Sequence, residues 1–363
     1  MQRRDFVRRS LLTASGALAA GCGLKQEQEP PNILTSPSIR WRLASSFPSA
    51  VDTLWGAATQ LAARVGELTE GKFQIQAFQA GELVPALQVF DAVSSGSVDA
   101  GHTASHYYGG KNSALGFDTG LPFGLNSRQQ IAWLNDAGGR ELINELLADF
   151  SIRSFSGGCT GAQAGGWFKR RISSLDDLKG LKFRMPGIGG EVLSRMGASI
   201  QVTPSAEIYL ALETGAIDGC EFVGPYDDEK LGFYKAAKYY TFPGWHEPGP
   251  TSTFYVNESA WQKLPHHYQI AFEVAAAEAS ADMLSKYDAK NAEALRRLLE
   301  KGVTLVHYPE DVLTTARRIA FEYYDELSNE NPAFRKIYSA WKDTRAATGA
   351  WLQLSELDQK LLS

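Results

Sequence analysis

Short runs of alternating apolar and polar residues are separated by runs with helical spacing. Residues 41–47 and 73–78 alternate, and between them apolar residues recur at steps of three and four from Leu54 to Leu68, before Gly71. The alternation predicts half-buried strands, and the helical spacing predicts an amphipathic helix that ends at a glycine. Strands separated by helices indicate an α/β fold with parallel sheets built from βαβ units.

The same pattern continues to about residue 257, and the remainder has the spacing of helices. Ser127 to Gln130 resembles a capping box that opens a helix running to about Phe150, and Ser174 is placed to cap a short helix. Further strands are expected at 98–104, 152–158, 181–187 and 252–257. Two long helices are expected near the end of the chain, over 258–302 and 309–345.

Polar and aromatic groups gather in the loops that follow these strands. In open parallel α/β sheets, ligands bind beyond the carboxyl ends of the strands. The loops with such groups are HTASHYYGG, GGCTGAQAGG, FRMPG, EFVGPYDDE and PGWHEPGPT, the last at residues 243–251. A ligand site is therefore expected where these loops meet.

Composition narrows the class of protein. With 363 residues and 44% hydrophobic residues, the chain is long enough for two domains or lobes. Its net charge of −5 argues against a nucleic-acid partner. No CxxC or Cys/His spacing predicts zinc. Cys159 and Cys220 are either buried free thiols, which we favour, or a disulfide.

The first residues are organised like an export signal. MQRRDFVRRS supplies arginines, residues 11–20 form an apolar run too short to span a membrane, and Gly21 precedes Cys22. RRDFV resembles a twin-arginine motif, and LAAGC resembles a lipoprotein box in which Cys22 carries the lipid. Cleavage of residues 1–21 without lipidation is the alternative. We expect a periplasmic protein that contacts the membrane only through such a lipid, with residues 22–38 as a flexible tether.

Several segments together resemble one family. WRLASSFP, FQIQAFQAGELVPALQVFDAV, GAQAGGWFKR, LKGLKFRMPG, ALETGAIDG and EFVGPYDDEKLGFYK are similar to the DctP-type extracytoplasmic solute-binding subunits of TRAP transporters. The resemblance covers roughly residues 40–345. GELVP together with VGPYDDEKLGF is specific to the branch that binds 2-oxo acids such as pyruvate, and to the related lactate binders. LKGLKFR alone indicates only the wider family.

The resemblance implies a two-lobed, periplasmic-binding-protein-like α/β fold with hinge crossovers, which closes over its ligand. It further implies delivery of the ligand to small and large membrane subunits that are driven by an ion gradient, without ATP. A long C-terminal helix packs on a second protomer in this branch, so we expect a homodimer. The expected parts are lobe I at 39–161 and 251–309, lobe II at 162–250, and a C-terminal helical region at 310–363.

The resemblance also implies which residues hold the ligand. Arg184 stands where the family has an arginine that grips the ligand carboxylate, and a guanidinium fork matches a carboxylate. A cation, Na⁺ or Ca²⁺, accompanies the ligand, and oxygen donors suit such hard ions. Its implied ligands are Gln163, the side chain of Glu221 and the main-chain carbonyl of Phe222, and Glu247 faces the same site. Without a cation, two glutamates and a ligand carboxylate would outnumber one arginine, and one of them would take up a proton.

Each of these residues could instead have a purely structural role. Arg184 is otherwise a surface cation on an edge strand, Gln163 a loop amide bonded to backbone, and Glu247 a solvated loop acid. Tyr107 and Tyr108 are expected to contact the ligand.

His106 is either a ligand contact or a packed ring, and Gly109 stands where relatives carry more aromatic residues.

Four acids lie close together in the segment CEFVGPYDDEK. We expect Glu221 to serve the ligand, and Asp227, Asp228 and Glu229 to open a helix after Pro225, where acids complement the helix dipole.

The predicted function is capture of a small 2-oxo monocarboxylate with a cation, followed by delivery to TRAP membrane subunits. A 2-hydroxy acid such as lactate, or service to an ABC importer or a sensor kinase, are the alternatives. An enzyme is disfavoured because the sequence has neither HExxH nor GxSxG.

Overall fold

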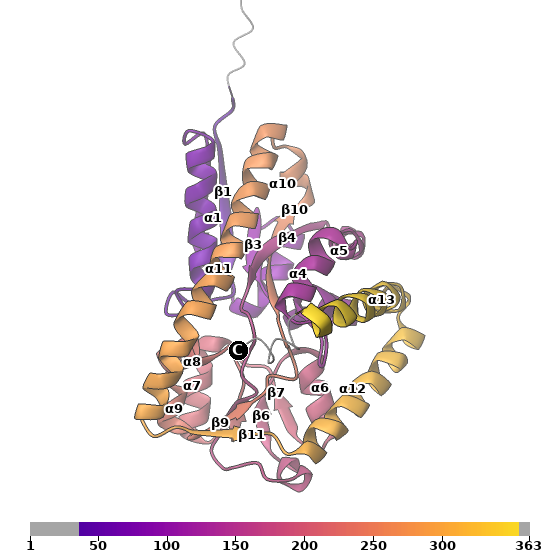
Figure 1. Ribbon diagram of the computed structural model, residues 1–363. Helices are drawn as coiled ribbons and strands as arrows, with labels where there is room; N and C mark the ends of the chain where they lie inside the picture. Colours follow the sequence, from indigo (N-terminus) through magenta and orange to yellow (C-terminus); the bar gives the residue numbers. More distant parts are fainter. Residues whose placement is uncertain (1–35, 356–363) are drawn as a thin grey trace, which may run out of the picture. The chain divides into compact units, whose positions relative to one another are not determined.

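A computed structural model describes residues 36–355. The predicted export signal, Cys22 and most of the predicted tether lie outside the described residues. Two mixed sheets organise the described chain (Figure 1). One has five strands in the order β2-β1-β3-β10-β4, and the other has six in the order β11-β9-β5-β8-β6-β7.

The strands and helices alternate over most of the described chain. The strands are β1 (Ile39–Ser45), β2 (Phe73–Phe78), β3 (Ala100–Thr103), β4 (Ile152–Cys159), β5 (Gly166–Phe168), β6 (Lys182–Arg184), β7 (Ser199–Gln201), β8 (Gly219–Cys220), β9 (Tyr239–Phe242), β10 (Thr251–Asn257) and β11 (Thr304–His307). The helices are α1 (Leu54–Leu68), α2 (Val89–Ser94), α3 (Gly116–Thr119), α4 (Ser127–Asp136), α5 (Gly139–Ala148), α6 (Gly187–Arg195), α7 (Ser205–Thr214), α8 (Pro225–Leu231), α9 (Phe233–Ala236), α10 (Glu258–Gln262), α11 (His266–Glu300), α12 (Glu310–Glu330) and α13 (Pro332–Ser355).

The α/β class is confirmed, but the sheets are not purely parallel as the sequence predicted. Strand β1 runs parallel to β2 and β3, whereas β10 runs antiparallel to β3 and β4, and β5 runs antiparallel to β8 and β9. The reversed strands β5 and β10 directly follow segments that join the two sheets without an intervening helix. Residues 160–165 lead from β4 to β5, and residues 243–250 lead from β9 back to β10. These two segments are called the crossovers below.

Strand β11 shows where the expected lobe boundary departs from the strand pairing. Its residues Thr304–His307 pair in parallel with β9, in the six-stranded sheet. The sequence had placed all of 251–309 with the other sheet. Helix α11 explains the difference, because it packs on α1 and β4 and further along on α8, and so carries the chain from one sheet to the other.

Several predicted helices differ from the observed ones for identifiable reasons, among them the helix predicted over 258–302, which residues 263–265 divide into α10 and α11. Asn126, not Ser127, is the N-cap of α4, and Gln129 completes the capping box. The helix predicted over 127–150 is two helices, because Gly138 adopts a left-handed conformation that interrupts it. The last predicted helix is likewise divided, at Asn331 before a proline. The capping box at Ser174 is confirmed.

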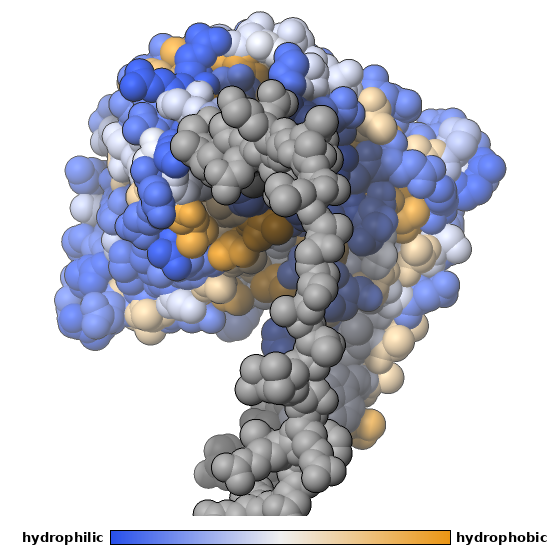
Figure 2. Space-filling model, turned by 90° about the horizontal axis from the view of Figure 1, so that it is seen from above, coloured by the Kyte–Doolittle hydropathy of each residue, from blue (hydrophilic) through white to orange (hydrophobic). Residues whose placement is uncertain are grey.

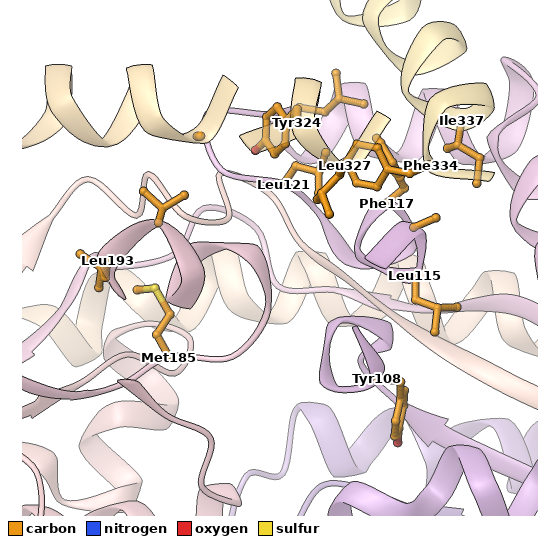
Figure 3. Packing of buried hydrophobic residues seen from close by; sticks show 14 of the residues in the cluster. Tyr108, Leu115, Phe117, Leu121, Met185, Leu193, Tyr324, Leu327, Phe334 and Ile337 are labelled. Atoms are coloured by element: carbon orange, nitrogen blue, oxygen red, sulfur yellow. The ribbon is translucent and has the colours of Figure 1, made fainter. Parts of the chain in front are cut away.

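The C-terminal helices pack on the chain's own core. Figure 3 shows side chains of α12 and α13 meeting Phe117 and Leu121 of the first half of the chain. The rings of Phe117 and Phe334 lie 4.8 Å apart, and Trp341 is buried in the same cluster. Phe334, Tyr338 and Trp341 are therefore core residues. The end of α13 differs, because Trp351 is 63% exposed and Leu354 is 72% exposed.

The surface of the described chain gives no sign of a spanning segment. Within residues 36–355, no helix combines the length and the apolar content that crossing a bilayer requires. The face in Figure 2 is largely hydrophilic, with hydrophobic residues in small areas between the polar ones where the described chain is visible.

Candidate functional site

A cavity of about 30 Å³ lies where loops from both sheets meet. Its walls come from the strand-end loops that the sequence singled out and from the two crossovers. The polar lining consists of His106, Tyr107, Thr119, Thr160, Gln163, Arg184, Glu221, Glu247, Thr251 and Ser252. The apolar lining consists of Phe47, Leu54, Ala104, Pro186, Phe222, Val223 and Pro250.

Arg184 ends strand β6 with its side chain buried in this cavity. The residue is 1% exposed, which excludes the alternative of a surface cation on an edge strand. Its Nη1 donates to the main-chain oxygen of Glu221 at 2.9 Å and to the Glu221 carboxylate at 2.5 Å, and its Nε donates to the Thr203 carbonyl at 3.1 Å. Burial opposes the charge of Arg184, but the Glu221 carboxylate raises the pKa of the guanidinium above its ordinary value.

Glu221 follows strand β8 and is 2% exposed. Its Oε1 pairs with Arg184, and its Oε2 lies 3.2 Å from Nε2 of His246. Burial disfavours the carboxylate, yet Arg184 and then His246 lower the pKa of Glu221 below its ordinary value. The side chain is therefore an ionised group held between two partners inside the cavity.

Gln163 lies on the first crossover, and its amide is oriented by a neighbour. The Nε2 atom donates to the Thr160 hydroxyl at 3.3 Å, so the Oε1 atom faces elsewhere and is buried without a hydrogen-bond partner. This arrangement differs from the alternative in which the amide bonds to the backbone. Phe222 lines the same cavity.

His106 and Glu247 are in direct contact at the cavity wall. His106 Nδ1 contacts Glu247 Oε1, and His106 Nε2 is buried without a hydrogen-bond partner. Glu247 is buried on the second crossover, so it is not the solvated loop acid of the alternative interpretation. His106 is both packed and at the cavity wall, where Nε2 remains available.

Tyr107 and Tyr108 lie in different environments. Tyr107 lines the cavity, where burial raises the pKa of its hydroxyl while Arg184 opposes the increase. Tyr108 is not brought to the cavity: its hydroxyl bonds to the Thr103 side chain at 2.8 Å and its ring packs on Phe90. Burial raises the pKa of Tyr108 to about 12. Tyr108 thus occupies a core position behind the loop.

The acids after Pro225 open α8 as predicted, but two of them point inward. Asp227 accepts from the Tyr287 hydroxyl, and burial raises the pKa of Asp227 to about 7. Asp228 is equally buried, with its pKa also raised to about 7 by burial. Glu229 faces outward and pairs with Arg297 at 2.8 Å. Helix-dipole complementarity is therefore not the main role of the two aspartates, because each is hydrogen-bonded inside the fold.

Both cysteines in the described chain are free and buried. Burial raises the pKa of the Cys159 thiol and of the Cys220 thiol, which makes each a poor nucleophile. The structure agrees with the favoured interpretation, in which the two do not form a disulfide.

Sequence reasoning missed two members of this site. His246 supports Glu221, and Thr160 orients Gln163. The sequence signal for His246 was its position beside Glu247 in a polar loop. That signal was weak, because its partner Glu221 lies 25 positions earlier on a different strand end.

Three polar atoms at the cavity remain without partners. They are a guanidinium donor, Nη2 of Arg184; an amide acceptor, Oε1 of Gln163; and a ring nitrogen, Nε2 of His106. Buried polar groups are normally paired, so such a set indicates a ligand with both acceptor and electropositive character. A carboxylate meets the donor, and a cation meets the amide oxygen.

The donor set fits a hard cation better than a transition metal. The oxygens of Gln163, Glu221 and the Phe222 main chain belong to the class that Na⁺ and Ca²⁺ prefer. Among residues 36–355, no group of three or more His, Cys, Asp or Glu side chains is arranged to enclose a metal. A site of the implied kind has no need of such a group, because amide, main-chain and ligand oxygens supply the remaining donors.

Known proteins that are similar to this chain include solute-binding proteins. Residues 44–331 match the model of the DctP family, described as bacterial extracellular solute-binding protein, family 7. A relative from Nostoc sp., named monocarboxylate 2-oxoacid-binding periplasmic protein, is 48% identical over 357 residues, which cover 98% of this chain and 97% of that protein.

Solved structures with the same fold include ligand-bound ones. A TRAP transporter solute-binding protein from Bordetella bronchiseptica, a mixed-occupancy dimer with calcium and picolinate in its active site, has a TM-score of 0.88 and 46% identity over 90% of this chain and 98% of that one. A protein from Pseudoalteromonas atlantica with bound sodium and pyruvate has a TM-score of 0.86 and 37% identity over 90% and 99% of the two chains. One from Colwellia psychrerythraea, with calcium and pyruvate, has the same values.

Proposed function

The chain belongs to the DctP family of bacterial extracellular solute-binding proteins, the solute-binding subunits of TRAP transporters, and from that premise we propose that it captures a small 2-oxo monocarboxylate together with one cation. Pyruvate and 2-oxobutyrate are the ligands of the proposed size. The observation that carries the proposal is the pair of unpartnered atoms in one cavity, Nη2 of Arg184 and Oε1 of Gln163.

In the proposed complex, Arg184 holds the ligand carboxylate. Its free Nη2 is a charged donor in a buried position, where a charge-assisted hydrogen bond is strong. The cation is Na⁺ or Ca²⁺, held by Gln163, Glu221 and the Phe222 carbonyl. Both ions are found with pyruvate in the Pseudoalteromonas and Colwellia proteins.

Charge and size support this assignment. Glu247 already pairs with His106, so we propose that it contributes negative charge to the site and holds His106 against the ligand. Tyr107 closes the same wall. A cavity of about 30 Å³ with an apolar part that includes Phe47 and Leu54 suits a short aliphatic chain better than a sugar acid.

The wider assignment follows from the family. We propose an exported, periplasmic protein whose two lobes, one around each sheet, close over the ligand and present it to the small and large membrane subunits. Lipidation of Cys22 and twin-arginine export remain part of this proposal. Relatives in the family are solute-binding transport proteins, and we propose that this chain likewise has no catalytic activity.

Calorimetric titration of the full chain tests the ligand assignment. Pyruvate, 2-oxobutyrate, longer 2-oxo acids and lactate are titrated with Na⁺, with Ca²⁺, and with chelator in a sodium-free buffer. We expect binding of short 2-oxo acids only when a cation is present. Tighter binding of lactate than of every 2-oxo acid would transfer the assignment to the 2-hydroxy acids.

A matched pair of variants tests the residue role. Arg184→Lys keeps the charge but loses the fork, and we expect at least a tenfold loss of pyruvate affinity. Arg195→Lys is the control, because Arg195 lies on α6 and pairs with Glu326 outside the cavity. Equal affinities for the two variants would exclude the proposed contact between Arg184 and the ligand.

A homodimer is proposed on separate grounds. Trp351 and Leu354 are exposed near the end of α13, and the Bordetella relative is described as a dimer. Light scattering is expected to show a dimer, and Trp351→Glu with Leu354→Glu is expected to give a monomer. A monomer for the unchanged protein at high concentration would refute the proposal.

A further inference from the structure

The segment that joins β8 to α8 carries two of the proposed cation ligands and has few anchors. Glu221 is fixed by its own main chain, because its N–H donates to the Arg184 carbonyl at 3.1 Å and its carbonyl accepts from Arg184 Nη1. Val223 is fixed by its carbonyl, which accepts from the Ala164 N–H at 3.0 Å. Between them, Phe222 takes part in no main-chain hydrogen bond recorded among the described residues.

One further anchor acts on the peptide plane that Phe222 shares with Val223. The Val223 N–H donates to Oδ1 of Asp228, at 3.4 Å. This bond is long, and it is the one hydrogen bond of the Val223 N–H recorded among the described residues. The distance leaves room for the bond to tighten when the segment takes up a ligand.

Because the two groups share one peptide plane, the hydrogen bond of the Val223 N–H also fixes the direction of the Phe222 carbonyl. The peptide bond between Phe222 and Val223 is trans, because the described cis bond lies at Phe242–Pro243. In a trans peptide the C=O and the N–H of one plane point in opposite directions. Phe222 and Val223 line the cavity, whereas Asp228 does not. An N–H held by Asp228 therefore turns the Phe222 carbonyl toward the cavity side.

Asp228 is itself rigidly held. It is 1% exposed, and its Oδ2 accepts from Nε1 of Trp167 at 2.9 Å and from the Tyr240 hydroxyl at 2.7 Å. The rings of Trp167 and Tyr240 stack with centroids 4.0 Å apart, so the two donors form one fixed wall. With Oδ2 occupied by these donors, Oδ1 remains for Val223.

We propose that Asp228 is a positioning residue for the cation. It holds the Val223 N–H, and through the shared peptide plane it orients the Phe222 carbonyl as a cation ligand. The inference rests on the proposed function, since it assumes that a cation binds with the 2-oxo acid. Asp228 touches neither the ligand nor the cation, and acts through this one peptide.

Three variants of the full chain test the inference. Asp228→Asn places an amide N–H₂ either against the Val223 N–H or against the Trp167 and Tyr240 donors. Asp227→Asn is the matched control, because Asp227 is equally buried on the same helix but bonds to Tyr287 instead. Tyr240→Phe removes one of the two hydrogen bonds to Oδ2 of Asp228, while Trp167 still holds Oδ2 and the bond from Val223 to Oδ1 stays in place.

The readout is the cation concentration that half-saturates pyruvate binding, measured for Na⁺ and for Ca²⁺. We expect Asp228→Asn to raise it by roughly tenfold or more, and the two controls to change it by less than about threefold. Such a separation is not expected from loss of stability alone, because all three variants remove a buried hydrogen bond. A similar change in all three would overturn the inference.

A measurement on the unchanged protein covers the case in which Asp228→Asn does not fold. The Val223 amide hydrogen should exchange slowly with solvent and more slowly still when cation and pyruvate are added. Fast exchange in the ligand-bound protein would overturn the inference. If the unchanged protein binds no 2-oxo acid with either cation, the proposed function itself fails, and this outcome is distinct from the others.

Discussion

Removal of Arg184 should destabilise the ligand-free protein more than removal of Arg184 and Glu221 together. In Arg184→Met, Glu221 stays buried with His246 as its remaining side-chain partner. Breaking a buried ion pair in this way typically costs about 3–5 kcal/mol, because one charge is left uncompensated. In the double variant with Glu221→Gln, no such charge remains.

The structure sets the size of the expected difference. Arg184 also loses its bonds to the Thr203 carbonyl and the Glu221 carbonyl in both variants, so these losses cancel in the comparison. What differs is the buried carboxylate. We therefore expect the double variant to be about 2 kcal/mol more stable than Arg184→Met.

Urea unfolding of the full chain, with chelator and without ligand, measures these free energies. The control is the exposed pair of Arg195 and Glu326, whose side chains are 32% and 49% exposed. For Arg195→Met with Glu326→Gln we expect a coupling below about 1 kcal/mol. If the free energies for Arg184→Met and Glu221→Gln simply add, the buried pair carries no coupling and the reasoning is refuted.

Three further results are expected. The free energy of unfolding should fall as pH rises from about 4 to about 7, by up to about 1.4 kcal/mol per pH unit for each of the two aspartates Asp227 and Asp228. The reason is that both keep a proton in the folded protein that the unfolded chain loses near pH 3.8. Urea unfolding of Asp227→Asn that depends on pH as much as that of the unchanged protein would contradict this assignment. Pyruvate at about 100 times its Kd should stabilise the protein by about 2.7 kcal/mol in thermal unfolding when Na⁺ or Ca²⁺ is present, and not after these cations are removed. The same stabilisation without a cation would show that pyruvate binding does not need the ion. Gly244→Ala should cost about 1–3 kcal/mol and weaken pyruvate binding, because its Cβ would lie 2.4 Å from the Gln163 carbonyl, whereas Gly110→Ala meets nothing within 4 Å; equal effects in unfolding and calorimetry would contradict the predicted clash.

Local patterns in the sequence predicted the elements well and their directions poorly. The alternation at 73–78 and the helical spacing from Leu54 correspond to β2 and α1. The direction of β5 and β10 was not predictable from such patterns, because alternation is the same in parallel and antiparallel strands. Both strands directly follow a segment that joins the two sheets without an intervening helix, and this connection is a long-range feature of the fold.

Of the site residues that the sequence predicted, all but Tyr108 line one cavity, whereas residues that reach the site only through long-range contacts were missed. Arg184 and Glu221 lie together in the cavity as that resemblance implied. His246 was missed because its partner is distant in sequence. Asp227 and Asp228 were assigned to the start of a helix, which is their position, but acids beside a Gly-Pro break give no sign of being buried. Their partners, among them Tyr287, come from elements far along the chain.

The placement of two proposed ligand residues on the crossovers is consistent with binding and lobe closure as one event. Gln163 lies on the crossover from β4 to β5, and Glu247 lies on the return from β9 to β10. The two crossovers touch backbone to backbone, since a Cβ at Gly165 would lie 2.7 Å from the Pro243 carbonyl. Arg184, by contrast, is fixed to the six-stranded sheet at the end of β6. We expect a change in the angle between the sheets to alter the distance from Arg184 to His106, which follows β3 of the five-stranded sheet, so a ligand that contacts both sides of the cavity would stabilise one angle over the others.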